Sequence, residues 1–177
     1  MQPTPGRRRR RLEIRGQVQG VGFRPCVYRL ATARGLVGHV ANTGHGATVE
    51  VEGAAADVDD FQRALLAELP PLARITSLRA FDLPPTHAET GFGIVASDAG
   101  TPARPEVTPD AATCADCLRE LFDPSDRRHG YPFINCTNCG PRYSIIRDVP
   151  YDRPRTTMAA FAMCPACAAE YLSLIHI

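Results

Sequence analysis

The sequence predicts an α+β domain followed by a small cysteine-rich region. Residues 8–97 alternate between strand-like and helix-like hydrophobic patterns. Residues 98–110 contain three prolines and few side chains that pack, which is typical of a linker. Residues 111–177 contain six of the seven cysteines, arranged as three Cys-x-x-Cys pairs. We therefore predict two structural units with the linker between them.

The first region begins with a strand and a helix. The strand is predicted over residues 10–18, where apolar residues lie at even spacing and so share one face. The helix is predicted from about residue 23, because Pro25 suits the first turn of a helix. Gly35 suits the position just after a helix end, so the helix is expected to stop there.

The rest of this region predicts four strands and one more helix. Strands over residues 36–43 and 47–53 are joined by a turn with two glycines, which indicates a hairpin. A helix is predicted over residues 57–69, since its apolar residues share one helical face and two prolines follow it. A strand over 75–83 and a short one over 92–95 come last. This order indicates a ferredoxin-like βαββαβ fold, with both helices on one face of an antiparallel sheet.

The turn between the first strand and the first helix has the composition of an anion-binding loop. Gly20 and Gly22 adopt a positive φ without steric penalty, so successive backbone N–H groups can point into one concavity. The helix that begins near Phe23 adds N–H groups and the positive end of its dipole. Arg24 adds a guanidinium suited to bidentate phosphate contacts. From the pattern alone, a tight turn without a ligand explains the glycines equally well.

Two motifs in this region resemble those of the acylphosphatase family. Residues 16–25, Gly-Gln-Val-Gln-Gly-Val-Gly-Phe-Arg-Pro, resemble the family signature, and residues 38–43, Gly-His-Val-Ala-Asn-Thr, resemble its second element. The resemblance implies an acylphosphatase domain in which Arg24 binds the phosphate and Asn42 orients the attacking water. The phosphate-binding residues that it implies are Gln19, Gly20, Val21, Gly22, Phe23 and Arg24.

Three other reactive side chains lie near these motifs. His39 and His45 flank Asn42, and each is a candidate general base, although no pattern favours that role. Cys26 is the unpaired cysteine. Its position on the predicted helix indicates a small packing residue rather than a nucleophile.

The first two cysteine pairs predict a closed metal site. Eighteen residues separate the pairs, a spacing that suits structural zinc held by four thiolates. The ligands would be Cys114, Cys117, Cys136 and Cys139. A region this short builds little core, so zinc binding is expected to supply much of its folding free energy. Candidates for the apolar cluster around the metal are Phe122, Tyr131, Phe133 and Ile134. Redox-active dithiols and disulfides remain alternatives for the same pairs.

The residues around the cysteines resemble the zinc-finger segment of the hydrogenase maturation carbamoyltransferases, the HypF family. The resemblance lies in residues 131–146 and 156–171. It implies an acylphosphatase-like domain followed by two zinc fingers, with ATP bound only by C-terminal domains beyond this chain. Cys164 and Cys167 would then form half of a second zinc site, whose other pair would lie past residue 177. The chain is therefore interpreted as the N-terminal part of such a protein, and weak or no metal binding is expected at this second pair.

The resemblance implies a function for the intact protein. It would hydrolyse carbamoyl phosphate and pass the carbamoyl group to a hydrogenase-maturation partner protein, and this chain would perform at most the hydrolysis. One alternative is a stand-alone general acylphosphatase, acting on other acyl phosphates, with a structural zinc module. A second alternative is a zinc-dependent nucleic-acid-binding protein that uses the arginine run Arg7–Arg11.

Composition weakens the nucleic-acid alternative. The formal net charge is only +1, and the cysteine-rich region lacks a basic stripe with interleaved aromatic residues. The arginine run is expected to be a disordered, solvated lead-in to the first strand.

No apolar stretch approaches the roughly 18 residues of a membrane span, so no membrane association is expected. Paired cysteines used for metal suit a reducing compartment, so a cytoplasmic location is expected.

Overall fold

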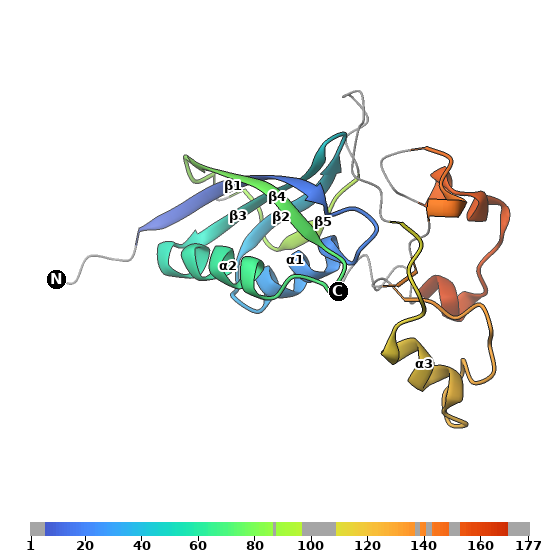
Figure 1. The fold of residues 1–177 in the computed structure, drawn as a ribbon. Helices are drawn as coiled ribbons and strands as arrows, with labels where there is room; N and C mark the ends of the chain where they lie inside the picture. Colours follow the sequence, from blue (N-terminus) through green and yellow to red (C-terminus); the bar gives the residue numbers. More distant parts are fainter. Residues whose placement is uncertain are drawn as a thin grey trace.

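The computed structural model describes residues 6–86, 88–96, 109–136, 139–140, 143–148 and 153–169 (Figure 1). An α+β unit comes first and a cysteine-rich region follows. Only the last two residues of the predicted linker are among the described residues. The strands and helices are β1 (Arg7–Gln17), α1 (Phe23–Thr32), β2 (Val37–Thr43), β3 (Gly46–Ala54), α2 (Ala55–Ala67), β4 (Arg74–Leu83), β5 (Phe92–Ile94) and α3 (Ala115–Phe122).

The predicted ferredoxin-like order is present, with one difference in the sheet. The strands lie in the order β4-β1-β3-β2-β5, and the first four pair antiparallel. β5 pairs parallel with β2, so the expectation of a wholly antiparallel sheet is wrong. The reason is that the chain leaves β4 at one edge and crosses to the opposite edge. There it hydrogen-bonds to the outer side of β2, which the hairpin with β3 leaves open.

Both long helices of this unit cover the same face of the sheet (Figure 1). Alternate residues of the strands point toward them, as the period of two predicts. The side chains between sheet and helices are almost completely buried. They include Leu12, Ile14, Val40, Val49, Val51, Phe23, Val27, Leu30, Val58, Phe61 and Leu65.

The arginine run is structured, so the expectation of a disordered lead-in is wrong. Arg7–Arg11 form the first half of β1. Arg8 donates from Nη1 to both carboxylate oxygens of Asp59 on α2, at 2.8 Å. Arg10 donates from Nε to Asp82 on β4, at 2.8 Å. Carboxylates on neighbouring elements therefore hold this part of the chain in the sheet.

The other arginines of the run point to the opposite face of the sheet, toward two buried glutamates of β3. Glu50 accepts from both Arg9 and Arg11, and Glu52 accepts from Arg7 at 2.7 Å. Both glutamates are 3% exposed, whereas the arginine side chains that pair with them are partly exposed to solvent. Each arginine of the run has a carboxylate partner, and the run is not a free basic surface for a nucleic acid.

The crossing segment between β4 and β5 covers part of this second face. The backbone N–H of Thr86 donates to Glu52 at 3.0 Å. Glu89 lies 3.2 Å from Nδ1 of His39 on β2. The segment then joins the sheet edge through a bond from the N–H of Gly38 to the carbonyl of Gly91, at 3.0 Å.

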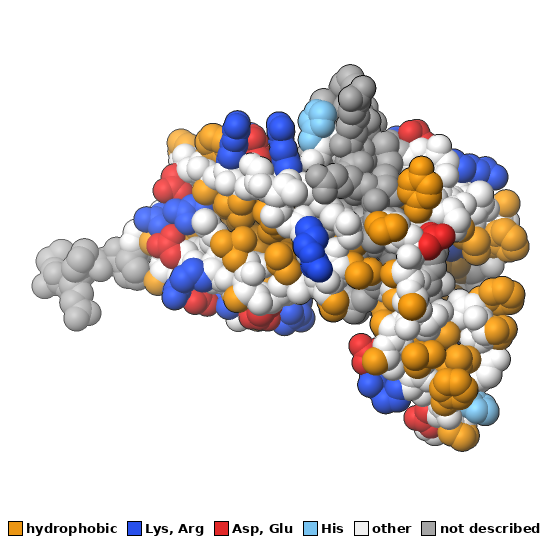
Figure 2. Space-filling view, in the orientation of Figure 1, with side chains coloured by type: hydrophobic (Ala, Val, Ile, Leu, Met, Phe, Trp, Pro, Cys, Tyr) orange, Lys and Arg blue, Asp and Glu red, His pale blue; other side chains and the backbone are white. Residues whose placement is uncertain are grey.

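The cysteine-rich region has a very small interior. Its buried cluster consists of Cys117, Ile134 and Cys139, with other sulfurs at its margin. Of the four apolar side chains expected around the metal, only Ile134 is buried. Tyr131 is half exposed, whereas Phe122 and Phe133 are about three-quarters exposed. Figure 2 shows hydrophobic side chains gathered on the surface over α3. The sulfurs take the central positions because so short a segment cannot enclose aromatic rings as well.

Candidate functional site

The loop between β1 and α1 has the backbone conformation that its glycines predict. Gly20 has φ of 69° and Gly22 has φ of 76°, both in the left-handed region. Gly22 is the residue that precedes the first turn of α1. The loop therefore turns its backbone sharply and leads directly into the positive end of a ten-residue helix.

Several N–H groups of this loop are available to an anion. Among the described residues, no acceptor pairs with the N–H groups of Gly20, Val21, Gly22 or Phe23. The side chains of Val21 and Phe23 are buried in the core, at 0% and 1% exposure. Only the backbone of these two residues is free to face a ligand, and the buried side chains fix that backbone in place. The arrangement fits an anion-binding nest of backbone N–H donors, whose position is fixed by the buried side chains of Val21 and Phe23.

Arg24 and Asn42 lie next to each other, although they come from different elements. Arg24 is in the first turn of α1, and Asn42 is near the end of β2. The Asn42 amide accepts hydrogen bonds through Oδ1 from Nε and Nη2 of Arg24, both at 3.2 Å. Asn42 is completely buried. Arg24 follows the anion loop directly in the sequence, so the site contains both a cation and a buried neutral polar group.

Gln19 shares the site in a way that the sequence does not reveal. Its side-chain amide donates to the backbone carbonyls of Thr43, at 2.7 Å, and Gly46, at 2.8 Å. The motif identifies Gln19 only as part of the loop. The partners of its side chain are backbone carbonyls far along the chain. Because every residue has a backbone carbonyl, the sequence does not indicate which ones accept these bonds.

The remaining candidates near the site have other roles. His39 projects from β2 to the face opposite Asn42, since the two residues are three positions apart on a strand, and it contacts Glu89. His45 is exposed in the β2–β3 turn. Cys26 is buried and its thiol donates to the carbonyl of Glu68 at 3.3 Å, so it is the packing residue that was predicted. Burial raises the pKa of this thiol, which opposes a nucleophilic role.

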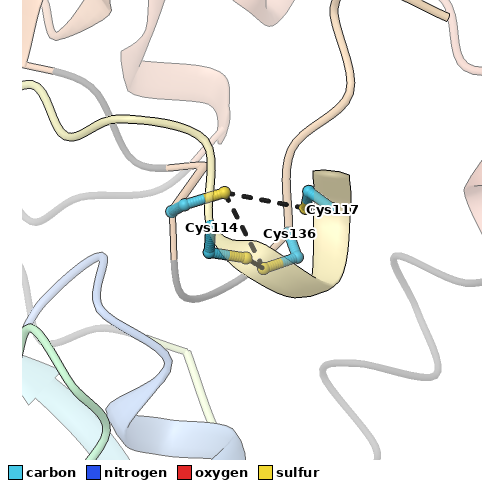
Figure 3. Close-up of side chains that lie close together, drawn as sticks. Cys114, Cys117 and Cys136 are labelled. Atoms are coloured by element: carbon cyan, nitrogen blue, oxygen red, sulfur yellow. Dashed lines mark hydrogen bonds between the residues drawn. The ribbon is translucent and has the colours of Figure 1, made fainter. Parts of the chain in front are cut away.

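The four cysteines of the first two pairs converge on one point (Figure 3). Their sulfurs all lie within 4.8 Å of one another. Neighbouring sulfurs are 3.6 Å apart for Cys114–Cys136, 3.9 Å for Cys136–Cys139 and 3.7 Å for Cys117–Cys139. Four sulfurs placed tetrahedrally at about 2.3 Å from a zinc ion would be about 3.8 Å apart. The set therefore fits zinc, and these distances are far too long for disulfides.

The protonation of these thiols is uneven without a metal. Burial, together with hydrogen bonds among the sulfurs, raises the pKa of Cys117 far above its usual range. Burial also opposes ionisation of Cys139, but hydrogen bonds from the backbone of Cys114 and Cys136 outweigh it and lower its pKa to about 7. One thiol thus ionises readily and another resists, so a metal must displace protons to bind all four.

The third pair stands apart from this cluster. Cys164 and Cys167 are exposed, and the N–H of Cys167 donates to the sulfur of Cys164 at 3.5 Å. Arg127 lies 3.9 Å from the sulfur of Cys167. In the described part of the chain no further histidine, cysteine or carboxylate completes a metal cluster around this pair.

A membrane span requires a helix that is both long and apolar. None of the helices in the described residues combines that length with that apolar character.

Comparison with known proteins agrees with this geometry. The family model for acylphosphatase matches residues 10–94, and the model for the HypF finger matches residues 113–146. The acylphosphatase of Mannheimia succiniciproducens is 39% identical over 82 residues, which cover 46% of this chain and 87% of the relative. The acylphosphatase match contains the anion loop, and the match to the HypF finger contains the four clustered cysteines.

Other relatives are similar along most of the chain. The carbamoyltransferase HypF of Rhodobacter capsulatus is 54% identical over 161 residues, covering 91% of this chain and 21% of the relative. A crystal structure of full-length HypF in a phosphate- and nucleotide-bound form superposes with a TM-score of 0.89 at 44% identity, covering 97% of this chain and 22% of that one. The chain thus spans about a fifth of the length of these relatives. Because an acylphosphatase domain and a HypF finger occur together in one chain with this degree of identity, the chain belongs to the HypF family of carbamoyltransferases.

Proposed function

We propose that this chain hydrolyses acyl phosphates at the site formed by Arg24, Asn42 and the loop Gln19–Phe23. The observation that supports this most is the contact between Arg24 and Asn42, next in the chain to four loop N–H groups that pair with no acceptor among the described residues. In the proposed site, a cation, backbone donors and a neutral amide would surround one position. Each of these groups suits a phosphate dianion or the water that attacks it.

The reaction needs only positioning and charge stabilisation. The oxygen of water forms a bond to phosphorus while the bond between phosphorus and the acyl oxygen breaks. A carboxylate leaves, and the protons of the water end on phosphate and solvent. The loop N–H groups and Arg24 would stabilise the phosphoryl oxygens, while Asn42 would orient the water without acting as a strong base.

The proposed substrate is carbamoyl phosphate, because the family is that of carbamoyltransferases. Hydrolysis would then yield phosphate and carbamate. In the longer relatives the carbamoyl group would go on to a hydrogenase-maturation partner, with ATP used by other parts of those proteins. We propose domains over residues 8–97 and 111–177, joined by residues 98–110, with structural zinc in the second domain and a cytoplasmic location.

The test compares two substrates and two arginine variants. The chain is expected to hydrolyse carbamoyl phosphate with a higher kcat/KM than benzoyl phosphate. Arg24→Ala is expected to lower the hydrolysis of both by about 10²–10³, because it removes a preorganised cation from the transition state. Arg29→Ala is the matched control, since Arg29 lies on the same helix but pairs at the surface with Glu68.

Three results would contradict these statements. Hydrolysis by Arg24→Ala at the wild-type rate would remove the proposed site. A strong preference for benzoyl phosphate would favour the general acylphosphatase instead. Equal loss in Arg29→Ala would show that the effect is one of helix stability.

A further inference from the structure

We propose that the edge of the sheet formed by β4 is a docking surface for an extended segment of a partner protein, in which acidic side chains alternate with apolar ones. The segment would add to β4 as a further strand, with its apolar side chains toward α2 and its acidic side chains on the outer face of the sheet. This surface shares no residue with the site of Arg24, Asn42 and the anion loop. The inference therefore does not depend on the proposed hydrolysis.

β4 forms the long, open edge of the sheet (Figure 1). Among the described residues it pairs only with β1, and it has ten residues, whereas β5 at the opposite edge has three. In a strand with one neighbour, alternate residues direct their backbone N–H and C=O groups away from that neighbour. β4 therefore presents a row of donors and acceptors of the kind that strand addition uses.

The helix layer leaves the inner side of β4 partly uncovered, because α2 packs over β1 and β3. Ala80 lies opposite Leu12 of the core and so faces the helix side, yet it is exposed. Leu78 on the same side is only partly buried, and Leu66 of α2 is 51% exposed. Figure 2 shows hydrophobic side chains gathered between β4 and α2. A strand added at this edge would bury them.

A groove of about 240 Å³ opens beside these apolar side chains. Most of its lining comes from one face of α2, since positions 59, 62, 63 and 66 are three or four residues apart. β1 contributes one further residue, whose cross-strand neighbour is on β4. The lining residues are Arg10, Asp59, Gln62, Arg63 and Leu66. An apolar side chain of the added segment would enter this groove next to Leu66.

Two arginines of β4 favour an acidic partner. Arg79 is exposed on the outer face, and it forms no ion pair with its cross-strand neighbour Glu13 or with another carboxylate of the described residues. Arg74 is also exposed, and its side chain donates to two backbone carbonyls just before β4. Phe81, two positions after Arg79 on the same face, is 43% exposed. The outer side of the edge thus offers cations next to an aromatic ring.

The carboxylates at this edge do not offset these cations, because other arginines already bind them. Asp59 accepts hydrogen bonds from Arg8 and Arg10, and Asp82 accepts one from Arg10. The positive charge of β4 is therefore left for a partner. Complementary charge selects acidic side chains over basic ones at such a surface.

The experiment uses a synthetic probe, acetyl-Thr-Leu-Glu-Val-Glu-Leu-Thr-amide, titrated into the full 177-residue chain and followed by NMR at the backbone N–H groups. We expect saturable shifts along Arg74–Leu83. The same peptide with lysine in place of both glutamates should bind about tenfold more weakly, because attractive pairs become repulsive. A version N-methylated at alternate residues lacks the main-chain donors of one edge and should not bind.

Variants of the chain identify the surface. Leu66→Ser should weaken binding of the acidic peptide about three- to tenfold, because it removes apolar contact area. Arg79→Glu should reverse the preference, so that the lysine peptide binds more tightly. Arg79→Gln should reduce the difference between the two peptides, and it replaces Arg79→Glu should that variant fail to fold beside Glu13. Leu118→Ser on α3 is the matched control, since Leu118 is 42% exposed, and it should bind like wild type.

Three results would overturn the inference. In the first, the acidic and the lysine peptides bind equally well. In the second, the shifts lie on β5 or α3 and not on β4. In the third, the β4 signals respond to the concentration of the chain and not to the peptide, which would mean that a second copy covers this edge. Acyl phosphate hydrolysis by the Leu66 and Arg79 variants should equal that of wild type, so failure of the proposed function and failure of this inference are observed separately.

Discussion

At the scale of single residues, the ion pairs around Glu50 show how a charged residue can be buried on the outer face of a sheet. Glu50 lies between Arg9 and Arg11, and all three side chains project from paired strands. Burial alone would raise the pKa of Glu50, but hydrogen bonds from Arg11 and Arg9 outweigh it, so its pKa is lowered below the ordinary value of 4.5. The folded state therefore favours the ionised carboxylate.

This lowered pKa predicts a defined pH dependence of stability. A carboxylate with a lower pKa in the folded state stabilises the protein above about pH 4.5, and this contribution is lost as the pH falls through the folded pKa. Glu50→Gln should lower the free energy of unfolding by about 1–3 kcal/mol at pH 7, and the difference from wild type should shrink below pH 4.5. Urea unfolding from pH 7 to pH 3 measures it.

A surface pair provides the control for this prediction. Glu68 pairs with Arg29 at 3.3 Å, and both side chains are about half exposed. Glu68→Gln should change stability by less than about 1 kcal/mol at any pH, because solvent screens such pairs. A difference between Glu50→Gln and wild type that is the same at pH 7 and pH 3 would contradict the assignment.

At the scale of elements, the cysteine-rich region depends on its metal. Its buried cluster contains few apolar side chains, and its cysteines hold the centre. We expect one zinc ion per chain, held by Cys114, Cys117, Cys136 and Cys139, and none retained by the third pair. Cys136→Ser should lose that ion, whereas Cys167→Ser, which changes the third pair, should keep it. Metal analysis after gel filtration measures the stoichiometry, and two ions per wild-type chain would contradict it.

The same thiols predict how zinc binding responds to pH. The pKa of Cys139 is lowered to about 7 and that of Cys117 is raised, so protons compete with zinc more strongly as the pH falls. Chelation should therefore remove zinc more readily at pH 6 than at pH 8. Acyl phosphate hydrolysis should persist after zinc is removed, because the core of the α+β unit shares no residue with the cysteine cluster.

Much of the architecture follows from sequence patterns, and the exceptions share a cause. Alternating apolar residues predict β1 to β4, and the glycine turn predicts the hairpin, because local spacing determines both. The start of β1 is missed because its stabilising partners, such as Asp59 and Asp82, are distant in sequence. The parallel pairing of β5 is missed for the same reason, since it depends on where a long connection ends.

In the candidate site, too, local motifs are predicted from the sequence, whereas contacts between distant residues are not. Gly20, Gly22 and the four clustered cysteines are identified by motif and spacing. The hydrogen bonds of the Gln19 side chain are not predicted, because their acceptors are backbone carbonyls that only the folded chain brings near it. The expected apolar shell of the metal is wrong for Phe122 and Phe133, because hydrophobicity alone does not tell how much volume a short segment can enclose.

At the scale of the whole molecule, the account depends on one claim: the loop between β1 and α1 binds the phosphoryl group through its backbone. The most direct test is a titration of the wild-type chain with inorganic phosphate, followed by NMR at the backbone N–H groups. We predict saturable shifts concentrated at Gly20, Val21, Gly22 and Phe23, and their loss in Arg24→Ala. Shifts that appear only elsewhere in the chain, or a loop that stays unchanged while acyl phosphate hydrolysis is fully inhibited by phosphate, would contradict it.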